Sequence, residues 1–384
     1  MFDAPSASEV VLSGAHVVTP DGVVDTSVVL RGGVIAGLSD SVSGQVDLTG
    51  QYLIPGVVDV HTDHVETHVH PRSSVRWAYL PALMAHDAVV ISGGTTTVFD
   101  SLCVGASVKR PERREILEPL VAALEDGCAR GVFRAEHLLH LRCEVADPET
   151  KDLVDHTIGK DITAMVSVMD HTPGDRQSPD VDRWLRVTIR DMGITMEEGH
   201  AVLDELLERS ARVGADVRAH VVAAAHAHGR PLMAHDDRTV DHVETAQAEG
   251  VTISEFPTTH AAARRARELG QIVVAGAPNY LRGGSQSGNV AVRELLSEHL
   301  VDVLASDYVP RSPLDAAFAI AADPDLAYDL PAAIALVSDA PARHSGLGDR
   351  GRISEGLRAD LVAVRLHDGQ PQVTAVWREG HRVF

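Results

Sequence analysis

Along most of the chain, short apolar runs alternate with longer segments that have helical periodicity. Eight runs are rich in β-branched residues, at 54–61, 94–100, 135–144, 162–171, 230–236, 250–256, 271–279 and 301–307. Segments with the spacing of amphipathic helices lie between them and end at glycine, at 113–131, 196–214, 215–229 and 260–270. Eight strand–helix units in succession predict an α/β protein built on a (β/α)8 TIM-like barrel.

The two ends of the chain have a different texture. Residues 8–52 form short alternating runs broken by glycine and Asp-Gly turns, a pattern typical of β-hairpins. Residues 351–384 repeat this pattern. We therefore predict that residues 1–53 and 346–384 form one small β-sandwich domain, with the barrel, residues 54–345, inserted between them.

Titratable residues end seven of the eight predicted barrel strands. They are His61 with Asp63 and His64, Asp100, Glu144, Asp170 with His171, His235 with Asp236 and Asp237, Glu255, and Asp307. The active sites of such barrels lie at the C-terminal strand ends. Burying this many titratable groups costs free energy unless something pairs with them.

A metal ion is the expected partner of this cluster. Mixed histidine and carboxylate ligands suit Zn²⁺, Mn²⁺ or another divalent first-row ion. His61 and Asp63 lie two residues apart, so they are expected to project to the same side of the first strand. Asp307 ends the last strand and is the expected acceptor of a proton from water. Two ions would lower the pKa of a bridging water and hold both the attacking and the leaving oxygen.

Composition limits the partners and the compartment. The 384 residues carry a formal net charge of -21, which argues against a nucleic-acid-binding surface. No apolar run is long enough to span a bilayer, and the N-terminal residues lack the pattern of a signal peptide. Three cysteines are too few for a disulfide framework. We expect a cytoplasmic protein without a membrane partner, and the sequence leaves a homo-oligomer open.

Several longer peptides resemble a known family. The peptides "LIPGVVDVHTDHVETHVHPRSSVRW", "GGTTTVFDSL", "MDHTPGDRQ", "MAHDD", "SEFPTT", "GAPNYLRGGSQSGNV" and "DVLASDYVP" resemble the PhnM proteins of phosphonate metabolism, in the amidohydrolase superfamily. The resemblance runs from about residue 8 to the C-terminus. It implies a metal-dependent diphosphatase of the carbon–phosphorus lyase pathway. Such an enzyme converts α-D-ribose 1-methylphosphonate 5-triphosphate to the 5-phosphate and pyrophosphate.

The resemblance also implies a ligand set, with departures from the superfamily pattern. The expected metal ligands are His61, Asp63, Glu144, His171, His235 and Asp307. The first strand carries His-x-Asp in place of the usual His-x-His, and no lysine ends a barrel strand. Glu144 is therefore the expected bridging ligand, or else a residue that supports the ligands. These departures leave open whether the metal is zinc or manganese and whether one or two ions bind.

The phosphate groups of such a substrate need hydrogen-bond donors. The expected substrate-binding residues are His64, Glu66, Arg72, Arg142, Arg176, Glu255, Arg282, Gly283, Gly284 and Ser285. Residues 281–289 follow the seventh strand, where barrels often bind phosphate, and arginine matches phosphate oxygens bidentately. Glu255 stands where the family has a sixth-strand histidine, so a metal ligand is its alternative role. His68 and His70 are expected to be solvated loop residues.

Two other functions stay open at this point. One is a C–N hydrolase, such as a cyclic amidase or a deaminase. The other is a metal-free relative that serves as a scaffold. The arginine- and glycine-bearing segments argue against the first, and the nearly complete set of strand-end ligands argues against the second.

Overall fold

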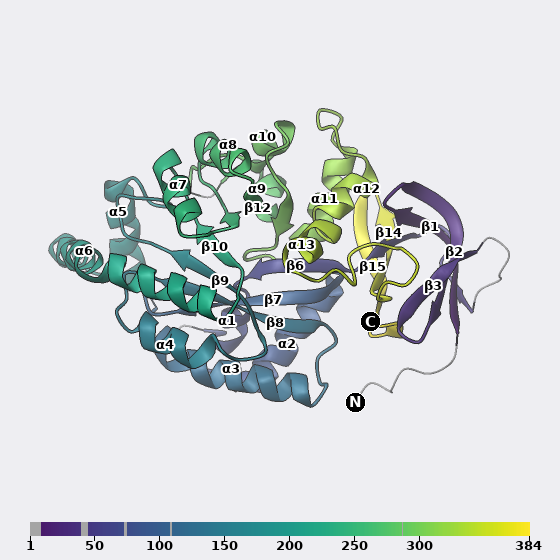
Figure 1. Cartoon of the computed structure of the whole chain (residues 1–384), viewed down its shortest axis with the longest axis horizontal. Coiled ribbons are helices and arrows are strands. Elements are labelled where there is room, and N and C mark those ends of the chain that lie inside the picture. The colour runs from purple at the N-terminus through teal and green to yellow at the C-terminus, as the bar shows by residue number, and fades with distance from the viewer. Residues whose placement is uncertain (1–8, 40–44, 73–74, 108–109, 286) are drawn as a thin grey trace.

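Two separate β-sheets organise the chain (Figure 1). One is an all-parallel sheet of eight strands, and the other is built from both ends of the chain. A computed structural model describes residues 9–39, 45–72, 75–107, 110–285 and 287–384. The expected α/β fold, a TIM-like barrel with a terminal β domain, is confirmed.

The parallel sheet closes into a barrel. Its strands are β6 (Val57–Thr62), β7 (Thr95–Val104), β8 (Glu136–Glu144), β9 (Thr163–Met169), β10 (Leu232–His235), β11 (Ile253–Glu255), β12 (Ile272–Gly276) and β13 (Val303–Ala305). They pair in chain order, and a parallel bridge between Thr62 and Asp307 joins the first strand to the last. The N–H of Asp307 donates to the carbonyl of His61 at 2.9 Å. All eight strands predicted from the apolar runs are present.

Helices pack around the barrel and where it adjoins the terminal sheet (Figure 1). They are α1 (Val65–Val69), α2 (Tyr79–Ser92), α3 (Arg113–Ala129), α4 (Thr150–Thr157), α5 (Val181–Met192), α6 (Met196–Ala227), α7 (Val240–Ala248), α8 (His260–Glu268), α9 (Ala277–Arg282), α10 (Val292–Ser297), α11 (Ser312–Ala322), α12 (Leu330–Ala335) and α13 (Asp339–His344). Among the described residues, no helix is both long and apolar enough to cross a membrane.

One helix differs from its prediction. The segments 196–214 and 215–229 were expected as two helices, but they form the single 32-residue helix α6. A glycine inside a helix costs only about 1 kcal/mol relative to alanine. Gly214 is buried within α6, and Val217 and Val221 beyond it continue the apolar face. The helix therefore continues through a residue that resembled a C-terminal signal.

Apolar packing fills the barrel below its polar end. Val58, Val60, Phe99, Met165 and Met233 belong to one buried cluster on the strands. Every residue of β7 is buried, as expected for a parallel strand between a packed interior and a covering helix layer. The polar side chains therefore gather at the strand ends and in a few buried networks.

The terminal sheet contains β1 (Val10–Thr19), β2 (Gly22–Arg31), β3 (Val34–Ser39), β4 (Val46–Asp47), β5 (Tyr52–Pro55), β14 (Leu361–His367), β15 (Gln370–Arg378) and β16 (His381–Arg382). Strands β5 and β14 pair antiparallel, so the two ends of the chain share one sheet. Gly56 links this sheet to β6 at a close approach, because an added Cβ would lie 2.1 Å from Thr96 Oγ1. Arg350 also reaches the barrel, donating to Glu136 at 2.5 Å.

Candidate active site

Three barrel strands end in an unusual backbone conformation. Asp236 and Phe256, directly after β10 and β11, and Asp307, two residues after β13, have φ of 60°, 55° and 54°. Left-handed conformations of non-glycine residues cost on the order of 1–3 kcal/mol and cluster at functional sites. Each of these residues still donates its N–H to a carbonyl of a neighbouring strand at 2.9 Å. The sheet therefore holds the three turns rigidly around the open end of the barrel.

A buried carboxylate joins two of the expected metal ligands. Glu255 at the end of β11 is fully buried, and its Oε1 lies 2.6 Å from Nδ1 of His61. Its Oε2 lies 2.6 Å from Nδ1 of His235. Burial raises the pKa of Glu255, but the surrounding histidines, led by His61 and His235, outweigh it and hold that pKa well below its ordinary value. The ionised carboxylate thus accepts one N–H from each ring and directs both Nε2 atoms away from itself.

These two rings fit a divalent cation. Nε2 of His61 is buried and has no hydrogen-bond partner, which is unusual for a buried polar atom. Oδ2 of Asp236 likewise makes no hydrogen bond, although it lies 3.3 Å from Nε2 of His235. His171, His235 and Asp236 each offer a ligand atom within 4.8 Å of the others. A carboxylate that holds the second nitrogen of a histidine is the usual support of a metal-ligating imidazole.

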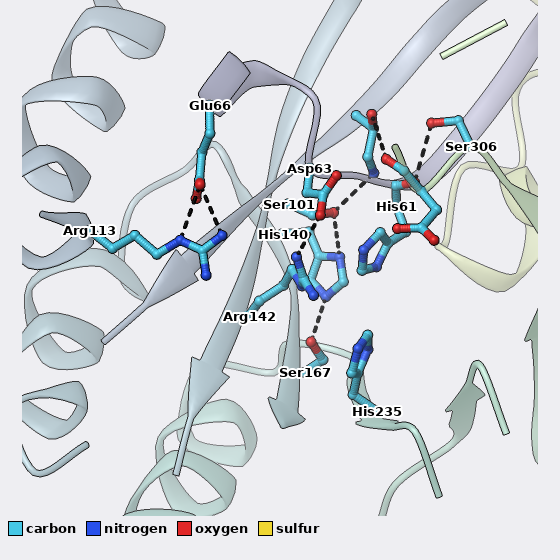
Figure 2. A network of polar contacts seen from close by, with 12 residues as sticks. His61, Asp63, Glu66, Ser101, Arg113, His140, Arg142, Ser167, His235 and Ser306 are labelled. Carbon is cyan, nitrogen blue, oxygen red and sulfur yellow. Dashed lines mark hydrogen bonds and ion pairs between the residues drawn. The ribbon is translucent and has the colours of Figure 1, made fainter. Parts of the chain in front are cut away.

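Asp63 and Asp307 lie on adjacent strand ends beside this group, because the N–H of Asp63 donates to the carbonyl of Asp307 at 3.0 Å. Burial and the nearby Asp63 carboxylate raise the pKa of Asp307 to about 6. Arg142 reaches from β8 and donates to Oδ2 of Asp63 at 3.4 Å (Figure 2). Close carboxylates of this kind repel one another unless cations lie between them. Arg142 supplies one positive charge next to these carboxylates. The histidine nitrogens and carboxylate oxygens of the cluster are suitable ligands for a metal cation, which would supply more positive charge.

Glu144 and His140 lie on the same strand as Arg142. Oε2 of Glu144 contacts Nδ1 of His171 at 2.8 Å, so in this arrangement the carboxylate orients the imidazole. His140 lies between the hydroxyls of Ser101 and Ser167, each at 3.0 Å (Figure 2). Burial lowers the pKa of His140 to about 3, so the ring is neutral. It packs against the ring of His61 with the centroids 5.4 Å apart.

The loop after β12 lines a pocket next to Asp307. Arg282, Ser285 and Asn279 line it together with Asp236, and it encloses about 660 Å³ of empty space that is partly open to solvent. Gly283 ends α9 with φ of 75°, and Gly284 follows with φ of 157°, so glycine is required for this turn. The expected phosphate-binding segment thus adjoins the titratable cluster.

The other expected substrate-binding residues lie elsewhere. Glu66 is turned toward Arg113 on α3, which donates to it at 2.9 and 3.1 Å (Figure 2). Arg176 forms a buried ion pair with Asp237, and Arg72 is exposed on the segment after α1. Glu255 has both oxygens engaged by histidines, as described above.

The histidines after β6 form a second group. His64 and His68 approach His86 of α2, with ring centroids 4.9 to 5.9 Å apart. The expectation that His68 and His70 are solvated loop residues was wrong. Both are half-buried, and Nε2 of each is shielded from solvent. Their burial follows from α1, which packs on α2 through the apolar Val65 and Val69.

Comparisons with known proteins identify the family. The Amidohydrolase family model matches residues 183–384. An α-D-ribose 1-methylphosphonate 5-triphosphate diphosphatase of Escherichia coli (strain K12) is 38% identical over 377 residues, covering 97% of this chain and all of that protein. The chain belongs to the amidohydrolase family. It is a hydrolase of that superfamily.

Solved structures of other proteins share the fold. An N-acetyl-D-glucosamine-6-phosphate deacetylase from Mycobacterium smegmatis has a TM-score of 0.64 at 16% identity, and 98% of this chain and 99% of that one are covered. A prolidase complexed with N-methylphosphonate-L-proline has a TM-score of 0.63 at 17% identity, with the same coverage. At these identities the likeness concerns the fold alone.

Two residues of this amidohydrolase site were missed as site residues by sequence reasoning. Asp236 was noted only as part of a strand end, yet its carboxylate faces His235 and His171. Asp59 is fully buried, and its Oδ1 accepts from the N–H of Ser306 at 3.0 Å. This contact ties β6 to β13 directly below the cluster. The sequence could have indicated Asp59, because it is an acid inside the apolar run 57–60 and a buried carboxylate needs a specific partner.

Proposed function

We propose that this amidohydrolase cleaves the triphosphate of α-D-ribose 1-methylphosphonate 5-triphosphate, giving the 5-phosphate and pyrophosphate. Water adds across the anhydride between the α- and β-phosphoryl groups. The observation that carries the proposal is the 38% identity, over nearly the whole chain, to a relative with this activity. The substrate is then a phosphorylated small molecule of the carbon–phosphorus lyase pathway. In this proposal the enzyme acts in the cytoplasm.

The metal-binding residues in this proposal are His61, Asp63, His171, His235 and Asp307, with Asp236 as a further donor. Glu144 serves as a ligand or as the support of His171. Zinc is the proposed ion, because imidazole and carboxylate donors suit it, and manganese is the alternative. A divalent ion supplies Lewis acidity toward a phosphoryl oxygen and lowers the pKa of water.

The chain's own groups act on the substrate and its proton. Asp307 accepts the proton of the attacking water, a role that its place at the end of the last barrel strand and in the lining of the adjacent pocket supports. Arg282 and Ser285 bind phosphate oxygens in the pocket beside it. A second pocket, lined by Arg113, Arg209 and Trp184, shares Ser287 with the first and offers room for the rest of the substrate.

A substrate comparison tests this proposal. The zinc-loaded protein is given the ribose triphosphate, a hydantoin and an N-acetylated sugar phosphate in parallel. We expect kcat/KM for the triphosphate to exceed that for either C–N substrate by at least about 10⁴-fold, the scale of discrimination that dedicated polar contacts provide. Faster hydrolysis of a C–N bond would refute the proposal in favour of a cyclic amidase or deaminase.

A further inference from the structure

A second group of histidines lies outside the strand-end cluster. His64 and His68 are four residues apart at and within α1, so their side chains share one face of the helix. His86 comes from α2, which packs against α1. The three residues each offer a ligand nitrogen, and these nitrogens lie within 4.8 Å of one another.

Each of these three residues has a buried ring nitrogen without a hydrogen-bond partner. Nδ1 of His64, Nε2 of His68 and Nδ1 of His86 are shielded from solvent and make no hydrogen bond. His86 is fully buried, so its unpaired nitrogen is costly unless something compensates. A different triad, His86 with Asp100 and His137, is also close together, but its atoms already satisfy one another through hydrogen bonds.

Asp100 prepares His86 for a role as ligand. Its Oδ1 accepts from Nε2 of His86 at 2.9 Å, which leaves a lone pair on Nδ1, the nitrogen of His86 that makes no hydrogen bond. Its Oδ2 contacts Nδ1 of His137 at 2.7 Å. The pattern matches that of Glu255, which holds Nδ1 of His61 and of His235 at the strand ends. In both places a buried carboxylate fixes a pair of imidazoles.

We propose that His64, His68 and His86 form a zinc site separate from the strand-end cluster. Tetrahedral Zn–N distances of about 2.0–2.1 Å set the three nitrogens about 3.3 Å apart, so binding draws the rings slightly together. The ion would fasten α1 to α2 directly after Asp63 and so fix the segment that carries this residue. Three histidines leave the fourth coordination position for water.

Metal content per chain tests the site with matched variants. The protein is freed of metal with a chelator, loaded with Zn²⁺ and analysed for zinc, as wild type, His68→Gln and His70→Gln. His70 is the control because it is also half-buried after the same strand but lies outside the trio. We expect His68→Gln to bind one equivalent less than wild type and His70→Gln to bind as much. Equal zinc in wild type and His68→Gln would overturn the proposal.

A second measurement separates this site from the strand-end cluster and guards against misfolding of one variant. In His61→Asn the strand-end cluster loses a ligand, and Co²⁺ replaces zinc as a spectroscopic probe. We expect the visible absorption of tetrahedral cobalt to persist in His61→Asn and to disappear when His68→Gln is added. Loss of all cobalt binding in His61→Asn alone would contradict a separate site.

Discussion

Replacing Glu255 by glutamine tests how the strand-end cluster is organised. The carboxylate accepts an N–H from His61 and another from His235, each at 2.6 Å, and is fully buried. A glutamine keeps the shape of the side chain but turns one acceptor into an NH₂ donor. The Nδ1–H of either His61 or His235 then points at the glutamine NH₂, which cannot accept a hydrogen bond. That ring must either lose the hydrogen bond or move its proton to Nε2, where that proton blocks metal binding.

The size of the effect follows from these two outcomes. Leaving a buried donor unpaired costs about 1–3 kcal/mol. Loss of a supporting partner typically lowers metal affinity 10- to 100-fold, which is about 1.4–2.7 kcal/mol. The cost of the unpaired donor and the usual loss of metal affinity are of the same size. We therefore expect Glu255→Gln to weaken zinc binding at this cluster by roughly 10- to 100-fold.

Competition with a chromophoric chelator measures this affinity. The experiment is best done in a His68→Gln background, so that only the strand-end cluster titrates. Glu249→Gln is the matched control, because this glutamate is also engaged by its partner, Arg218, at 2.7 Å, but precedes β11 at the other end of the barrel. An unchanged zinc affinity in Glu255→Gln would refute the reasoning.

Three further changes have expected outcomes. Asp307→Asn should lower kcat by about 10²- to 10⁴-fold, the scale of general base catalysis, with loss of substrate binding as the contradicting result. Arg282→Ala should raise KM about 10- to 100-fold through loss of a charged hydrogen bond worth about 1.5–3 kcal/mol, whereas Arg264→Ala on α8 should leave KM unchanged. Burial opposes protonation of His137, but Asp100 outweighs it and raises its pKa from 6.5 to about 9. The contribution of the His137–Asp100 pair to the free energy of unfolding should therefore be fully present below pH 6.5 and be lost as pH rises through about 9. Asp100→Asn should remove this fall between pH 6.5 and 9 in urea titrations.

Much of the fold could be predicted from the chain alone. The eight apolar runs gave the barrel strands, because a parallel strand covered on both faces must be apolar along most of its length. The terminal sheet followed from the hairpin pattern of both ends. The prediction of a break near Gly214 was wrong, because packing of Val217 and Val221 outweighs the propensity of a single glycine.

The chemistry of individual site residues was harder to predict. The positions of residues at strand ends indicated which side chains could lie close together. They did not indicate which hydrogen bonds and ion pairs those side chains form. Glu66 and Arg176 looked like substrate-binding groups, yet Arg113 and Asp237 engage them, and these partners are distant in sequence. The trio of His64, His68 and His86 depends on how α1 packs against α2, which periodicity does not reveal.

The central claim is that the strand-end cluster hydrolyses a phosphoric anhydride, and product analysis by ³¹P NMR tests it most directly. Zinc-loaded wild type and His61→Asn are incubated with α-D-ribose 1-methylphosphonate 5-triphosphate. We expect equal amounts of pyrophosphate and the ribose 5-phosphate from wild type, and almost none of either product from His61→Asn. Release of orthophosphate in place of pyrophosphate, or equal product from both proteins, would contradict it.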